Sequence, residues 1–325
     1  MDIPLDFKPV RFASEHLPVR DRLPAWREVY GPRVNGADVQ PVSSVPFRAD
    51  VTLRALPGFG LTITESTPAR YARTRRFLAD GRDYFGLHVS FAGGACGQRD
   101  REIACGPSTA VLMNVAEAGW IVSGRQMRFW GLWFHRAKLE PRVAGLDDRV
   151  LQPIASDSEQ VRYLIGYVRY LEEQQTLADP EVARIAAVHL RDLFVLLLGG
   201  KRDARILAQG RGLRAARLQA IKRYVADTLG QPELSVSTAA AHHRVAPRYV
   251  QRLFEGEGTT FSEYVLNERL ARVHKMLANP YYARRTVSAI VLEAGFGDVS
   301  YFNRRFRRRY GMRPSDVRAG APPKA

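Results

Sequence analysis

The hydrophobic period of this chain changes near Pro153, and this change constrains the fold more than any other feature. Between Phe47 and His135, short segments alternate apolar and polar residues or are rich in β-branched and aromatic residues, as strands are. These segments are FRADVTLRAL, FGLTITEST, YFGLHVSF, TAVLMNV and MRFWGLWFH. After Pro153 the apolar residues recur at helical spacing. The pattern predicts an α+β protein whose β-rich part comes first and whose helical part comes last.

Turn residues separate the predicted strands, at Pro57-Gly58, Gly93-Gly94 and Gly106-Pro107. Short strands with such turns are typical of a small antiparallel barrel or sandwich. Two amphipathic helices are expected within residues 157–199. Their apolar stripes are Val161, Leu164, Ile165, Val168 and Leu171, then Val182, Ile185, Leu190, Leu193, Phe194 and Leu197. These stripes either cover the β-domain or form a dimer interface, and the sequence favours neither.

The length of the chain, 325 residues, exceeds the roughly 100 to 200 residues of a usual domain and predicts two domains. The segment GGKRDARILAQGRG, from Gly199 to Gly212, mixes glycine with charge and is the best boundary. We expect an N-terminal domain over residues 1–200, a linker over 201–212 and a C-terminal domain over 213–325.

Positive charge is concentrated in the last third of the chain. Residues from Arg211 onward carry 21 Lys and Arg and 9 Asp and Glu, a net of +12, whereas the preceding residues supply only +4 of the total of +16. Such a charge attracts polyanions, nucleic acid above all. The alternative is a solvated surface with no specific partner.

Several classes of protein lack their residue patterns here. The longest apolar stretch, Leu193 to Leu198, is far shorter than the roughly 20 residues of a membrane span, so no membrane partner is expected. The N-terminal MDIPLDFKPVRF has no signal-peptide pattern, which favours a cytoplasmic protein. We interpret Cys96 and Cys105 as structural thiols. The scattered histidines give no metal site, so neither a metal nor another cofactor is expected.

A first helix-turn-helix unit is predicted after the helix that ends at Gly230. Its first helix is SVSTAAAHH, in which alanines allow close packing, and its second is PRYVQRLFEGEG, which opens with Pro247. In the second helix, the inward residues are Val250, Leu253 and Phe254, and the outward ones are Arg248, Gln251 and Arg252. Tyr249 suits packing and contact equally.

A second unit follows a long helix predicted over residues 261–278. Thr286 is expected to cap its first helix, which ends at a turn around Gly295, and Asp298 is expected to cap its last helix. Phe302 and Phe306 point inward. The outward residues of that helix are Val299, Ser300, Tyr301, Asn303, Arg304, Arg307 and Arg308.

This pattern has the chemistry of a DNA reader. A helix presented N-terminus first fits the major groove, where Arg binds guanine, Asn or Gln binds adenine, and further Arg residues bind phosphates. At about 1.5 Å per residue the long helix spans on the order of 27 Å. Two recognition helices joined by such a rod are expected to enter successive turns of one DNA face, roughly 34 Å apart.

The helical region closely resembles the AraC/XylS family of bacterial transcription regulators over about 100 residues. The resemblance lies in VAPRYVQRLFEGEGTTFSEYVLNERLARVHKML and VSAIVLEAGFGDVSYFNRRFRRRYGMRPSDVR. It implies a C-terminal all-α domain with two helix-turn-helix motifs joined by a long helix. The implied DNA-binding residues are Arg248, Gln251 and Arg252 in the first recognition helix, and Val299, Ser300, Tyr301, Asn303 and Arg304 in the second; Tyr249 and Arg308 are added as candidates from their positions.

Three residues depart from the family pattern. Arg244 stands where the first turn usually has glycine, and Ala246 stands where a serine often caps the recognition helix. Ala246 cannot accept a hydrogen bond from the first amides of the helix, so we expect a looser first unit. Val291 replaces a smaller residue and makes the second unit bulkier.

Three N-terminal segments are FRADVTLRAL, the Arg-rich YARTRRF and the turn and strand CGPSTAVLMN. Through them this region resembles, more faintly, the cupin-like β-barrel sensing domains of such regulators. The resemblance implies that it binds a small-molecule effector and dimerises the protein through residues 157–199. It also implies promoter DNA as partner, activation more often than repression, and RNA polymerase as a further partner of an activator. The cationic YARTRRF suits either an acidic effector or a charged strand edge. The sequence assigns no effector-binding residue.

Two other functions were weighed. An enzyme built on the barrel is disfavoured because the chain has no metal-ligand spacing, phosphate loop or nucleophile elbow; no catalytic residue is assigned. The reactive cysteine cluster of DNA-repair relatives is excluded by the presence of only two cysteines. A non-specific architectural DNA binder would not need outward Asn, Gln and Tyr on two recognition helices.

Overall fold

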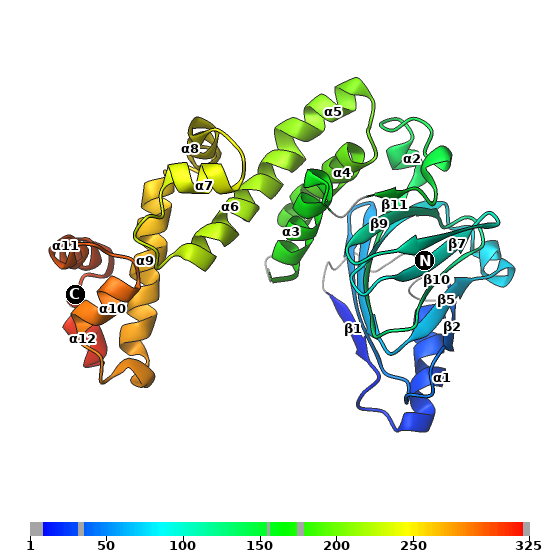
Figure 1. Cartoon of the computed structure of the whole chain (residues 1–325), viewed down its shortest axis with the longest axis horizontal. Coiled ribbons are helices and arrows are strands. Elements are labelled where there is room, and N and C mark those ends of the chain that lie inside the picture. Colours follow the sequence, from blue (N-terminus) through cyan, green and yellow to red (C-terminus); the bar gives the residue numbers. More distant parts are fainter. Residues whose placement is uncertain (1–8, 32–35, 155–156, 174–178, 321–325) are drawn as a thin grey trace. The chain divides into compact units, whose positions relative to one another are not determined.

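The computed structural model describes residues 9–31, 36–154, 157–173 and 179–320. Its Cα positions divide into two compact units, residues 1–216 and 217–325 (Figure 1). The first unit is β-rich and the second is entirely helical where described, as the change of period predicts. Residues 1–8, the start of the segment that we examined for export signals, lie outside the described residues. No helix in the described part of the chain is long and apolar enough to cross a membrane.

Two antiparallel sheets form the body of the first unit. The seven-stranded sheet has the order β1 (Val10–Ala13), β3 (Ala49–Leu56), β4 (Phe59–Ser66), β11 (Met127–His135), β6 (Tyr84–Ser90), β9 (Thr109–Asn114) and β12 (Pro153–Ile154). The five-stranded sheet has the order β2 (Asp38–Pro41), β5 (Ala69–Arg73), β10 (Gly119–Ser123), β7 (Gly94–Gln98) and β8 (Arg101–Cys105). The antiparallel β-domain is confirmed, but the sheets stay open instead of closing into the predicted barrel.

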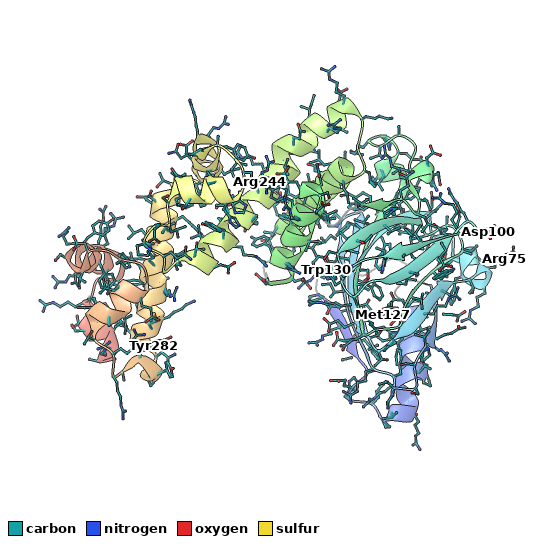
Figure 2. The ribbon with its side chains drawn as sticks, in the orientation of Figure 1. Arg75, Asp100, Met127, Trp130, Arg244 and Tyr282 are labelled. Atoms are coloured by element: carbon teal, nitrogen blue, oxygen red, sulfur yellow. The ribbon has the colours of Figure 1, made fainter. Side chains whose placement is uncertain are left out.

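Strand β11 shows how the larger sheet separates two environments. Phe129, Gly131 and Trp133 face the interior between the sheets, and the alternate residues Trp130 and Phe134 face the helices. Trp130, labelled in Figure 2, is 1% exposed. The Phe134 ring lies 4.7 Å from that of Phe194 on the helix α4. The helices after the β-region therefore cover this sheet, which is the first of their two predicted roles.

Helices complete the first unit. They are α1 (Val19–Val29), α2 (Arg136–Leu139), α3 (Glu159–Glu173), α4 (Pro180–Leu197), α5 (Arg202–Ala208) and the short turns η2 (Arg75–Asp80) and η3 (Asp147–Arg149). The predicted stripe of α4 is wrong at its start, where Val182 and Ile185 are 37% and 47% exposed. The alanines 183, 186 and 187 are buried instead, because small residues let α3 and α4 approach closely.

The segment that we expect to be a linker is helical. Helix α5 continues through the π-helical turn η5 (Gln209–Leu213) into α6 (Arg214–Thr228). Arg211 donates from Nε to Oδ2 of Asp192 on α4 over 3.0 Å. A Cβ at Gly212 would lie 2.6 Å from Cβ of Asp192, so glycine allows this close approach. The segment thus packs against α4 within the first unit.

Seven helices and one short turn make up the described second unit and its entry: α6, α7 (Val236–His242), α8 (Pro247–Glu255), α9 (Phe261–Ala278), η6 (Pro280–Tyr282), α10 (Val287–Glu293), α11 (Val299–Tyr310) and α12 (Pro314–Arg318). They enclose two cores. The first core extends from Leu218 to Val265, and the second begins at Leu266 and includes Phe302 and Phe306. The long helix α9 supplies both cores and divides them between Val265 and Leu266.

Candidate nucleic-acid interface

The first helix-turn-helix pair consists of α7 and α8. Ser235 and Thr238 cap α7 reciprocally: the Thr238 N–H donates to Ser235 Oγ over 3.2 Å, and the Ser235 N–H donates to Thr238 Oγ1 over 2.9 Å. Ala239 and Ala240 are buried, which lets α8 pack closely. The turn contains Arg244 (Figure 2) in the left-handed region, with φ of 54°. This is the conformation that explains why the family usually has glycine there.

Helix α8 presents an outward polar face. Arg248, Gln251 and Arg252 are exposed. Tyr249 is half-buried against the first core, and the guanidinium of Arg252 lies 5.9 Å from its ring centroid. The Ala246 side chain makes no cap hydrogen bond, as its chemistry requires, and Pro247 opens the helix. Tyr249 is therefore placed to pack while it supports a neighbouring cation.

The second pair consists of α10 and α11. Thr286 caps α10 by accepting from the Ala289 N–H over 3.1 Å, and Gly295 makes the turn with φ of 93°. Val291 is fully buried. Asp298 Oδ1 caps α11 by accepting from the Ser300 and Tyr301 N–H groups over 2.7 and 3.0 Å. The Tyr301 and Ser300 amides hold the pKa of this carboxyl below its ordinary value.

Helix α11 exposes most of the predicted residues. Ser300, Tyr301, Arg304 and Arg308 are exposed, whereas Asn303 is half-buried. Val299 is half-buried against the second core, so its position serves packing as well as surface. These side chains come from the first three turns of a helix whose N-terminus is capped and exposed.

A hollow surface joins α11 to its neighbours. It is lined by Val287, Ser288, Val299, Ser300, Asn303, Arg304, Arg307, Arg313, Pro314 and Ser315. Sequence reasoning placed Ser300, Asn303 and Arg304 together here, but it missed Ser288 and Arg313. Their signal in the sequence is their position: Ser288 is the second residue of α10, and Arg313 directly precedes α12. Arg309 packs on α9 instead of lining this hollow: its Nη1 donates to the Asn267 backbone oxygen over 3.1 Å.

The first unit contains a separate cavity of about 70 Å³ between its sheets. Its lining includes Tyr71, Gly86, His88, Gln98, Met113, Phe129, Gly131 and Trp133. A Cβ at Gly86 or Gly131 would lie 2.7 or 2.6 Å from the Trp133 ring, so the two glycines let this indole lie flat on the sheet. Burial lowers the pKa of His88 to about 4, which keeps its imidazole neutral at pH 7.

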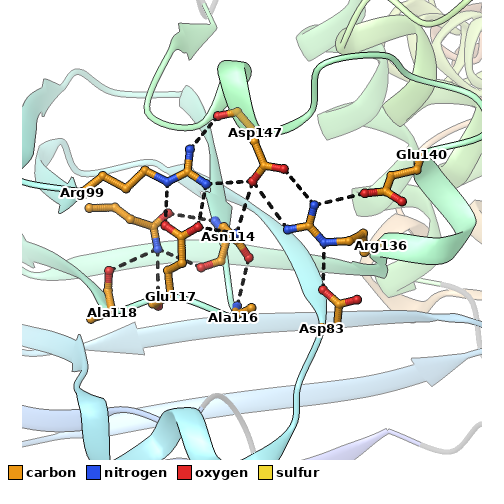
Figure 3. Close-up of polar contacts among 10 residues, drawn as sticks. Asp83, Arg99, Asn114, Ala116, Glu117, Ala118, Arg136, Glu140 and Asp147 are labelled. Carbon is orange, nitrogen blue, oxygen red and sulfur yellow. Dashed lines mark hydrogen bonds and ion pairs between the residues drawn. The ribbon is translucent and has the colours of Figure 1, made fainter.

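An ion-pair network lies beside this cavity (Figure 3). Arg99 donates to Glu117 and Asp147, with separations of 2.6 and 2.7 Å, and Arg136 donates to Asp147 over 2.8 Å. Asn114 donates from Nδ2 to Glu117 over 2.8 Å. Hydrogen bonding to Arg99 lowers the pKa of Glu117, and hydrogen bonding to Arg136 lowers that of Asp147. The network therefore remains ionised and holds Glu117 and Asn114, which line the cavity.

The YARTRRF segment is not the charged strand edge that was one of its two predicted roles. Strand β5 pairs on both sides, with β2 and with β10, and its Tyr71 and Arg73 are buried. The Arg73 side chain is 7% exposed, and its Nη2 donates to Asp80 over 2.7 Å. Its Nε donates to the Val115 backbone oxygen over 2.6 Å. This cation has a structural role.

The fold and surface of the second unit define a protein with paired helix-turn-helix motifs. Residues 239–320 match the family model described as a helix-turn-helix domain. The chain therefore carries a helix-turn-helix domain, as the resemblance predicts.

Relatives match over different parts of the chain. Transcriptional activator RhrA of Rhizobium meliloti is 36% identical over 169 residues, which are 52% of each chain. The XylDLEGF operon transcriptional activator of Pseudomonas putida is 24% identical over 163 residues, 48% of this chain and 49% of the relative. The chain spans about half the length of these curated relatives. The structure of the AraC-like transcriptional activator CuxR covers 88% of this chain and 100% of its own at 17% identity, with a TM-score of 0.49.

Proposed function

We propose that this protein is a sequence-specific DNA-binding transcription regulator that reads DNA with α8 and α11. One observation carries the proposal: two helices, each on its own core, present exposed Arg together with Gln251 or Asn303. Amide side chains distinguish adenine in the major groove, and Arg distinguishes guanine or binds phosphate. A protein that held DNA only by charge would not need the amides.

Roles follow from position on each helix. Gln251, Asn303 and Arg304 are the proposed base readers, with Ser300 and Tyr301 beside them. Arg248, Arg252 and Arg308 are the proposed phosphate contacts, which set affinity and orientation. Tyr249 and Val299 support these side chains by packing. Arg307 and Arg313, in the same hollow as Arg304, are added as phosphate contacts.

The test is selection of bound fragments from genomic DNA by the full-length protein, followed by salt-titrated binding. Arg304→Ala and Gln251→Ala are expected to weaken binding to the selected fragment about 10-fold or more, because each removes about 1–3 kcal/mol of base discrimination. Binding to random DNA should weaken far less. Arg75→Ala and Gln160→Ala are matched controls, since both residues are exposed in the first unit. Equal binding of all fragments with one salt slope would instead indicate an architectural phosphate binder.

The cavity is the proposed effector site. Its aromatic walls and neutral His88 favour a small, uncharged, planar molecule, because Arg73 and Glu117 in the lining are already paired. Phenol is a suitable probe: it should quench tryptophan fluorescence in the wild type and quench it much less in Trp133→Phe, where only Trp120 of the two lining tryptophans remains. An unchanged signal at saturating phenol would argue against this ligand class.

The assembly and cellular role are also proposals. The exposed apolar pair Val182 and Ile185 on α4 supports a homodimer, so Ile185→Asp should reduce the mass measured by sedimentation. The matched relatives are transcriptional activators, which favours activation through RNA polymerase, in the cytoplasm where promoters are accessible. The same relatives belong to a class of regulators without catalytic activity, so an enzymatic role has no support.

A further inference from the structure

The two helix-turn-helix units meet at a junction that neither recognition helix contains. Helix α9 passes from the first core to the second between Val265 and Leu266. Arg269 follows Val265 by one helical turn and so faces the first core side of α9. Its guanidinium reaches the carboxyl end of α6, where Nε donates to the Leu229 oxygen over 3.0 Å and Nη2 to the Gln231 oxygen over 2.8 Å.

The turn of the second helix-turn-helix motif, between α10 and α11, lies against the same atoms. Gly295, between α10 and α11, has φ of 93°. A Cβ at this position would lie 2.5 Å from the Leu229 oxygen and 2.8 Å from Nε and Nη2 of Arg269. A Cβ at Gly230 would lie 2.8 Å from the Glu293 oxygen. The end of α6, the Arg269 side chain and the turn between α10 and α11 are therefore in direct contact.

The chemistry at this junction favours one fixed arrangement. Three backbone oxygens, those of Leu229, Gln231 and Glu293, converge here, and two of them accept from one planar guanidinium. A guanidinium holds its N–H groups in a rigid plane, whereas an ammonium is a compact point donor. Burial lowers the pKa of Arg269, although an arginine stays charged throughout the ordinary pH range.

We propose that Arg269 holds α8 and α11 at a single separation and thereby sets the spacing between the two DNA segments that the protein reads. The inference rests on the proposed function and adds a positioning residue that does not touch DNA. Spacing is a sharp property, because one inserted base pair moves the second segment by about 3.4 Å and rotates it by roughly 35°. A rigid pair of helices cannot follow that shift, but a hinged pair can.

The experiment compares the wild type with Arg269→Lys, which keeps the charge and loses the planar donor pair. Both full-length proteins are titrated with the selected fragment and with versions that carry one or two base pairs inserted between its two segments. For the wild type, each insertion should weaken binding about 10-fold or more. For Arg269→Lys, the unmodified fragment should bind about 10-fold more weakly, and the insertions should cost less than about 3-fold.

Two further variants keep the result specific to the junction. Gly230→Ala places a Cβ against the Glu293 oxygen on the other side of the junction. It should reduce the loss of affinity that the insertions cause, as Arg269→Lys does. Lys275→Gln removes an exposed charge from the same helix and should preserve the wild-type penalty. Thermal unfolding is measured in parallel to detect a loss of stability. A residue that only stabilised the fold would weaken binding to all fragments by one factor and leave the insertion penalty unchanged.

The outcomes separate this inference from the function on which it rests. If the wild type selects no motif at all, the proposed function fails. If it selects a motif of two segments and Arg269→Lys and Gly230→Ala retain the full insertion penalty, the role of Arg269 is overturned while the function stands. A selected motif with one segment also overturns the inference, because no spacing is then read.

Discussion

The Asp298 carboxylate accepts a hydrogen bond from the Tyr301 backbone N–H over 3.0 Å, and it thereby fixes the first turn of the helix that presents Arg304. Asp298→Ala should destabilise the second unit, since it leaves N-terminal amides without an acceptor. It should also weaken binding to the selected fragment more than binding to random DNA, because a frayed first turn misplaces Ser300 and Tyr301. Asp298→Asn retains an acceptor and should stay near the wild type in both measurements.

The Asp298 cap also predicts how the stability of the second unit changes with pH. Because the folded pKa of Asp298 is lowered, its contribution to stability is present above the unfolded pKa of about 3.9 and is lost as pH falls through the folded value. Ellipticity at 222 nm follows the helices of both units, and the fluorescence of tryptophans 26, 120, 130 and 133 follows the first unit, where all four lie. The unfolding of the second unit is the ellipticity change that the fluorescence does not share. An Asp298→Ala difference that did not shrink on acidification would contradict the cap.

The larger sheet was predictable and the smaller one was not. Every strand that we predicted, β3, β4, β6, β9 and β11, belongs to the seven-stranded sheet, because these strands carry long apolar side chains on a buried face. The five-stranded sheet contains GACGQ and GWIVS, which have no such alternation. Gly97 is required there because a Cβ would lie 2.5 Å from the Trp120 ring. That requirement comes from a neighbouring strand and leaves no local signal.

Helices α8 and α11 were predictable because their pattern is local. Phe302 and Phe306 mark the buried face at i and i+4, and the capping residue and the glycine turns mark the ends. Residues at the margin of a face, such as Tyr249 and Val299, gave no clear assignment because helical spacing leaves them half-buried. The role of Arg269 was not predictable, because its acceptors Leu229 and Gln231 lie 40 and 38 residues away in sequence.

Arg244 offers a stabilising substitution. Its φ of 54° costs a non-glycine residue about 1 kcal/mol, so Arg244→Gly should stabilise the second unit by about that amount. The measurement is urea unfolding followed by ellipticity. Arg248→Gly is the matched control: it places glycine within α8 and should destabilise by about 1 kcal/mol. Destabilisation by both changes would show that Arg244 makes contacts worth more than its backbone strain.

Arg73 is predicted to be costly to replace. Arg73→Met takes one donor from Asp80, which keeps its pair with Arg82. It also leaves the Val115 backbone oxygen without this donor, and a buried acceptor left unsatisfied costs about 1–3 kcal/mol. Tryptophan fluorescence in urea measures this loss in the first unit. Arg76→Met breaks the exposed pair with Asp38 and should cost less than about 1 kcal/mol. Similar losses for the two variants would mean that Arg73 is not a structural cation.

His88 should make the first unit sensitive to mild acid. Its folded pKa of about 4 lies below the ordinary value of 6.5, so the unfolded chain binds the proton first as pH falls from 6.5 toward 4. The resulting loss of stability amounts to on the order of 3 kcal/mol for a shift of this size. His88→Gln lacks the titrating group, so its stability should fall less over the same interval; His189, whose pKa burial also lowers, accounts for part of what remains. If the wild type and His88→Gln lost stability in parallel between pH 6.5 and 4, the imidazole would not be the neutral, buried wall that the proposed effector site requires.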